Sequence, residues 1–129
     1  MSAIPERILR VAVAIVLGIH GVHRAVTGGY LLFGHYLSST GWPGGTYLAA
    51  AITLGEMLGA TALLANRFVF WACCGHALIL AGGIVMVHAP AGWFVVGAGR
   101  NGVEFSVLLL ACLAAIAWPH RPGRRPPSP

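Results

Sequence analysis

Long apolar stretches constrain the fold of this chain more than any motif does. Residues 68–87 contain a single polar side chain, His76, and residues 105–118 contain only Ser106. A helix needs about 20 mainly apolar residues to cross the hydrocarbon core of a bilayer. The sequence therefore predicts an all-α integral membrane protein, a four-helix transmembrane bundle. The predicted spans are residues 8–27, 46–65, 68–88 and 103–118, in one domain, 1–118, and a disordered, basic, proline-rich tail is expected at 119–129.

The few charges of the chain point to lipid as its main surroundings. Hydrophobic residues make up 57% of the sequence and charged residues 9%, too few charges for the surface of a soluble domain. Eight arginines against three acidic residues give a net charge of +5. Nucleic-acid binding requires basic residues gathered on a polar surface. Because these arginines lie mostly at the ends of apolar runs, we expect a bilayer and no nucleic acid as partner.

The distribution of arginines predicts the orientation of the spans. Cytoplasmic loops of membrane proteins carry an excess of basic residues. In a four-span arrangement six arginines fall on one side and two on the other, so both termini are expected in the cytoplasm, at a bacterial-type cytoplasmic (inner) membrane. The first group is Arg7, Arg10, Arg67, Arg121, Arg124 and Arg125, and the second is Arg24 and Arg100. The connection 28–45, rich in glycine and aromatic residues, is expected at the membrane interface with a short helix over residues 31–37.

Three ionisable residues inside the predicted spans are the first candidate site. His20 lies ten residues after Arg10, and Glu56 and His76 lie eleven before and nine after Arg67. At 1.5 Å per residue all three are about 14–16 Å deep, and we expect them to meet in the interior of the bundle. Glu56 is predicted to be protonated or paired with a histidine. Two interpretations stay open: a proton relay facing a quinone, with Glu56, His20 and His76 as catalytic residues, or a structural hydrogen bond between helices.

The same residues suggest metal-based alternatives that we consider weaker. His20 and His76 have the relative depth of two axial haem ligands, and Cys73 lies one turn from His76, as in a metal site completed by His20 and Glu56. We expect neither haem nor metal. Cys73, Cys74 and Cys112 are predicted to be buried, inert thiols.

A second polar cluster is predicted near the outer membrane face. It comprises His23 and Arg24 at the end of the first span and His88, Asn101 and Glu104 around the last hairpin. An ion pair between Arg24 and Glu104 is expected, with Glu104 also favoured by its place at a helix N-terminus. One interpretation is a structural cap of the bundle. The other is a binding mouth that admits a quinone head group or a partner protein.

The order of several motifs resembles the DoxX family of membrane proteins. The resemblance rests on His88, Gly92-Trp93-Phe94 and Asn101-Gly102-Val103-Glu104, preceded by Gly41-Trp42-Pro43 and Gly55-Glu56, and covers most of residues 5–118. It implies a four-helix membrane protein that acts as a subunit or accessory protein of a redox system, with quinone as a possible cofactor and a respiratory protein as a partner. Its clearest association is with thiosulfate:quinone oxidoreductase. The alternative is a non-catalytic structural subunit that packs against a larger membrane complex.

Overall fold

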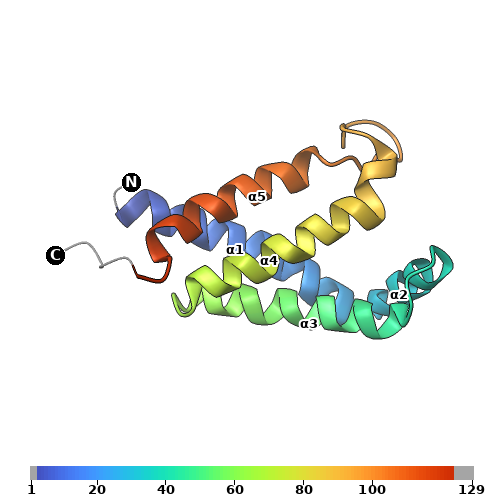
Figure 1. The fold of residues 1–129 in the computed structure, drawn as a ribbon, viewed down its shortest axis with the longest axis horizontal. Helices are drawn as coiled ribbons and strands as arrows, with labels where there is room; N and C mark the ends of the chain where they lie inside the picture. The colour runs from blue at the N-terminus through green and yellow to red at the C-terminus, as the bar shows by residue number, and fades with distance from the viewer. Residues whose placement is uncertain (1–2, 124–129) are drawn as a thin grey trace.

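The computed structural model describes residues 3–123, and all regular secondary structure in this part of the chain is helical (Figure 1). The predicted all-α class is confirmed for these residues. Residues 124–129, which include Arg124 and Arg125 of the predicted basic tail, lie outside the described part. The α-helices are α1 (Ala3–Val26), α2 (Gly29–Ser39), α3 (Gly45–Leu64), α4 (Val69–Gly83) and α5 (Glu104–Ala117), and the short elements are a π-helix, η1 (Ile84–His88), and two 3-10 turns, η2 (Ala89–Ala91) and η3 (Trp118–His120).

Three of the helical segments are long and apolar enough to cross a membrane. They are Ile4–Val26, Gly45–Leu64 and Val69–Ala91, and they coincide closely with the first three predicted spans. The fourth apolar segment, Glu104–His120, is shorter. The membrane character predicted from composition is therefore supported, with three candidate spans by length and composition.

The segment between the first two candidate spans contains a complete helix, α2. The sequence predicted a helix over residues 31–37, and the observed helix extends two residues further at each end. Glycines let α2 lie directly on the start of α3: a Cβ at Gly34 would overlap the backbone of Thr46, and a Cβ at Gly45 would overlap α2. The close backbone contact fixes α2 across one end of the helix assembly, at the right in Figure 1.

The four longer helices pack in a closed circuit around one apolar core. Helix α1 packs on α3 and α5, and α4 packs on the same two helices. Leu17, Leu63 and Leu113 are each at most 3% exposed at its centre. Many large apolar side chains on the outside are uncovered by protein, as expected for surfaces that face lipid.

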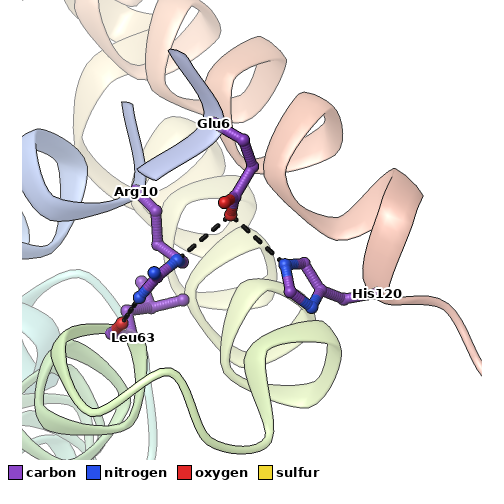
Figure 2. Close-up of polar contacts among 4 residues, drawn as sticks. All are labelled: Glu6, Arg10, Leu63 and His120. Carbon is purple, nitrogen blue, oxygen red and sulfur yellow. Dashed lines mark hydrogen bonds and ion pairs between the residues drawn. The ribbon is translucent and has the colours of Figure 1, made fainter. Parts of the chain in front are cut away.

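A polar cluster joins the first part of α1 to the end of α3 and to η3. Glu6 Oε1 accepts hydrogen bonds from Arg10 Nε at 3.1 Å and from His120 Nε2 at 3.2 Å, and Arg10 Nη1 donates to the Leu63 carbonyl (Figure 2). Arg10 is only 5% exposed. This buried arginine therefore connects α1 to α3 and, through Glu6, to η3, in addition to placing a positive charge near a helix end. His120, at the start of the predicted tail, belongs to this cluster.

Candidate functional site

A cavity of about 360 Å³ lies between α1, α2, α3, α4 with η1, the hairpin of residues 92–103 and the first part of α5. Most of its wall is apolar, with Phe33, Ile52, Ile79 and Met86 among the lining residues. The polar residues at the wall include members of both clusters predicted from the sequence, namely His20, Arg24, Glu56, His88 and Asn101. Ser106, which belongs to neither predicted cluster, also lines the cavity.

An ion pair between Arg24 and Glu56 crosses this cavity wall from α1 to α3. Arg24 Nη1 donates to Glu56 Oε2 at 2.8 Å and to Thr53 Oγ1 at 3.4 Å. Thr53 in turn donates to the Ala49 carbonyl, so its oxygen is turned toward the arginine. The guanidinium group also lies 5.2 Å from the centre of the Phe33 ring, a cation–π contact supplied by α2. Three helices therefore hold one arginine in a fixed position.

The predicted ion pair between Arg24 and Glu104 was wrong, and so was the pairing of Glu56 with a histidine, one of the two states expected for that residue. Arg24 and Glu56 pair with each other. The reason lies in helix geometry, because side chains on an α-helix lean toward its N-terminus. The long side chain of Arg24 therefore reaches back along α1 to Glu56, away from the hairpin that carries Glu104.

Glu104 instead fastens the hairpin before α5. Its Oε1 accepts a hydrogen bond from the Val95 backbone N–H at 3.0 Å, and its own N–H donates to the Trp93 carbonyl at 3.1 Å. Gly102 lies so close to Trp93 that a Cβ there would overlap the Trp93 backbone. Glu104 thus does not line the cavity, but it holds the backbone of Val95, which does.

His88 stands where α4 gives way to the hairpin, and its orientation is defined. The Asn101 carbonyl lies 2.8 Å from His88 Nδ1 and can only accept, so Nδ1 carries the hydrogen. His88 is the last residue of the π-helix η1, a rare element that occurs often at functional sites. Tyr36 Oη donates to the Met86 carbonyl in the same turn at 3.2 Å, so α2 also braces this side of the cavity.

The remaining predicted histidines have different surroundings. His20 lines the cavity beside Arg24 and Glu56. His76 is 1% exposed and lies against Gly59, with its Nε2 lacking a hydrogen-bond partner among the described residues, and it is not part of the cavity wall. His23 lies in a separate, shallower groove of about 460 Å³ on the other side of the α1 and α3 pair. The expected meeting of His20, Glu56 and His76 is therefore limited to the first two.

The described residues contain no group of three or more His, Cys, Asp or Glu side chains arranged to hold a metal ion. The three cysteines are free thiols: Cys73 is buried, Cys112 is partly buried and Cys74 is exposed. The prediction of burial was wrong for Cys74, because neighbouring residues on a helix point in different directions and only Cys73 faces the core.

Besides Ser106, two residues that hold Arg24 in place were missed by sequence reasoning. Thr53 lies one turn before Glu56 on the same face of α3, a spacing that the sequence does display. Phe33 lies in the segment between the first two spans, and no local sequence pattern indicates that this segment approaches Arg24. Comparisons with family models, curated proteins and solved structures find no match to this chain.

Proposed function

We propose that this chain is a four-span protein of a bacterial-type cytoplasmic membrane, with both termini in the cytoplasm, that binds a quinone head group as part of a redox system. One observation carries the proposal: polar residues from separate parts of the sequence line one mainly apolar cavity. Binding sites for small organic molecules combine apolar walls with a few convergent polar groups in this way. The polar residues concerned are His20, Arg24, Glu56, His88 and Asn101.

The chemistry of a quinone matches this cavity. Its ring is flat and apolar, its oxygens accept hydrogen bonds in the oxidised form and also donate them in the reduced form, and its tail dissolves in lipid. The cavity volume of about 360 Å³ lies in the range of small-molecule sites, about 300–1,000 Å³. Arg24 is a donor for a quinone oxygen, and the aromatic ring of Phe33 provides a flat wall beside it.

Proton exchange is assigned to Glu56 and His20. Both line the cavity, and both side chains can gain or lose a proton, as the two-proton chemistry of quinones requires. His76 has no such access because it lies behind Gly59, outside the cavity wall. Electrons would come from a protein partner or a soluble donor, in line with the resemblance to the DoxX family and its redox role.

A structural subunit is the second candidate function, and a different observation favours it. Helix α4 and the π-helix η1 that continues it expose Trp71, Leu78 and Val85 at seven-residue intervals, with exposed fractions of 64%, 76% and 67%. Such a stripe along one face suits packing against another membrane helix. In this case the Arg24–Glu56 pair serves only to hold α1 against α3.

Glu56→Gln separates the two functions. The amide keeps the shape of the side chain but removes the titrating group. For a quinone-linked protein we expect activity of membranes to fall about 100-fold or more, as is usual when one acid–base step is lost, while assembly is retained. The measurement is quinone-linked oxidoreductase activity together with saturable binding of decyl benzoquinone to the purified protein in lipid nanodiscs.

The control is His35→Asn, which alters an exposed histidine of α2 outside the cavity wall. Wild-type activity in a normally assembled Glu56→Gln protein would remove Glu56 from the proposed proton exchange. Absence of saturable quinone binding to the wild-type protein would reject the quinone site altogether and favour the structural subunit.

A further inference from the structure

The bonding of His88 leaves one of its ring nitrogens as an acceptor. Nδ1 donates to the Asn101 carbonyl, so in the neutral ring Nε2 has a free lone pair. Nε2 has no hydrogen-bond partner among the described residues. It is also accessible, because it is absent from the buried atoms of these residues that lack a partner. The Nε2 and Cδ2 edge of the ring lies over Gly83, which lines the cavity, and would be 3.8–3.9 Å from a Cβ placed there. A bare acceptor is therefore held at the cavity wall.

Arg24 supplies unused donors to the same cavity. Both of its hydrogen bonds use Nη1, and within residues 3–123 neither Nε nor Nη2 has a protein acceptor. The side chain is 22% exposed, and Arg24 is one of the residues that line the cavity. Since Glu56, Thr53 and Phe33 already fix the guanidinium group, a ligand would meet it in place at little ordering cost.

These two groups differ in what they require of a ligand. The free N–H groups of Arg24 bind any oxygen with a lone pair, which both a quinone carbonyl and a hydroquinone hydroxyl possess. His88 Nε2 accepts a hydrogen, which only the hydroxyl of the reduced form can provide. We infer that His88 is the specificity residue that makes this cavity select hydroquinone over quinone, while Arg24 holds an oxygen of either form. This inference rests on the proposed quinone function and adds the redox state of the preferred ligand.

The test compares equilibrium binding of decyl benzoquinone and its hydroquinone to the protein in nanodiscs under anaerobic conditions, with binding to empty nanodiscs subtracted. One added hydrogen bond predicts about fivefold to tenfold tighter binding of the hydroquinone to the wild-type protein. In His88→Asn the amide nitrogen replaces Nδ1 and can keep the Asn101 bond, but nothing replaces Nε2, so the preference should vanish. In His88→Gln the amide oxygen replaces the Nε2 acceptor, and part of the preference should remain.

Three controls complete the design. His35→Asn makes the same chemical change outside the cavity and should retain the preference. Arg24→Gln should weaken both redox forms by a similar factor. The dimethyl ether of the hydroquinone, which cannot donate, should bind the wild-type protein no better than the quinone, and this comparison requires no variant to fold.

The outcomes distinguish this inference from the function on which it rests. Equal wild-type binding of both forms, or an unchanged preference in His88→Asn, would overturn the role of His88 while leaving a quinone site in place. Tight binding of the dimethyl ether would do the same. If the wild-type protein binds neither form, the quinone site and the selectivity fall together.

Discussion

Arg24 of α1 and Glu56 of α3 form an ion pair of 2.8 Å at the wall of the cavity, and both side chains are largely withdrawn from the surface. The two helices that carry these residues also pack directly on each other. A Cβ at Gly21 of α1 would lie only 3.1 Å from the Cβ of Glu56 on α3. The pair therefore connects the stability of the helix assembly to the polarity of the cavity.

Removing one member of this pair should cost more than removing both. Arg24→Gln or Glu56→Gln alone leaves a partly buried charge without its partner, for which we expect a loss of about 2–4 kcal/mol in unfolding free energy. The double variant removes both charges and should recover a large part of that loss. Unfolding curves in mixed detergent micelles measure the effect. Strictly additive losses would mean that the two charges do not interact.

Gly59 should tolerate a methyl group poorly. A Cβ at this position would overlap the buried His76 ring, so Gly59→Ala forces α3 and α4 apart or turns the ring, at a cost of about 1–3 kcal/mol. Gly75→Ala is the matched control on α4, because no atom lies within 4 Å of the added methyl. Thermal unfolding of the two variants should differ clearly, and equal melting temperatures would contradict the observed packing of His76 on Gly59.

Glu104 should protect the hairpin amide of Val95. The carboxylate accepts that N–H at 3.0 Å, and a hydrogen bond to a charged group contributes about 1.5–3 kcal/mol. Glu104→Ala should raise the exchange rate of the Val95 amide by about tenfold or more, whereas Glu104→Gln retains an acceptor and should raise it less. Site-resolved hydrogen exchange checks both. Unchanged exchange in the alanine variant would show that the hairpin is held by its backbone alone.

Arg10 and His120 should contribute unequally to their polar cluster with Glu6. Arg10 is 5% exposed and satisfies both Glu6 and the Leu63 carbonyl, so Arg10→Met should cost about 2–4 kcal/mol. The side chain of His120 is 31% exposed, and such a surface ion pair contributes about 0–1 kcal/mol. Unfolding of the two single variants provides the comparison. A larger effect from His120→Ala would place the main fastening of α1 at η3 instead of α3.

Membrane orientation can be tested in cells. If both termini are cytoplasmic, a cysteine placed at Ala98 of the 92–103 hairpin, in a background with the native cysteines replaced, should react with an impermeant reagent applied from outside. A reporter fused after Pro129 should be active in the cytoplasm. A cysteine introduced at Arg67, at the opposite end, is the control and should be protected. Labelling with the reverse preference would contradict the orientation given by the arginine count.

The helices could be predicted from the sequence because their signal is local. Apolar runs of about 20 residues and the glycine-rich breaks at residues 28–29 and 44–45 fix where α1, α2 and α3 begin and end. Two of the residues that line the cavity were predictable as well, since residue counting predicted that His20 and Glu56 lie at a similar level of the bundle, and both line the cavity. The partner of Arg24 was not, because depth was counted along the backbone and ignored the reach and tilt of a long side chain. The separation of His76 from the cavity depends on how α4 is rotated against Gly59, which residue counting does not reveal.

The π-helix at the end of α4 sets the direction in which the chain leaves that helix. Each residue of an α-helix turns the chain by about 100°, and a π turn accommodates one residue more than an α turn. If the same five residues, Ile84–His88, formed regular α-helix instead, the extra residue would turn everything beyond that point around the helix axis by about a quarter of a circle. The imidazole would then face a different neighbour, and the chain would enter the loop in a direction that no longer leads back to α5. The connection between α4 and α5 is thus defined by a direction as well as by a length. Its glycine-rich middle can accept changes that the π-helix at its start cannot.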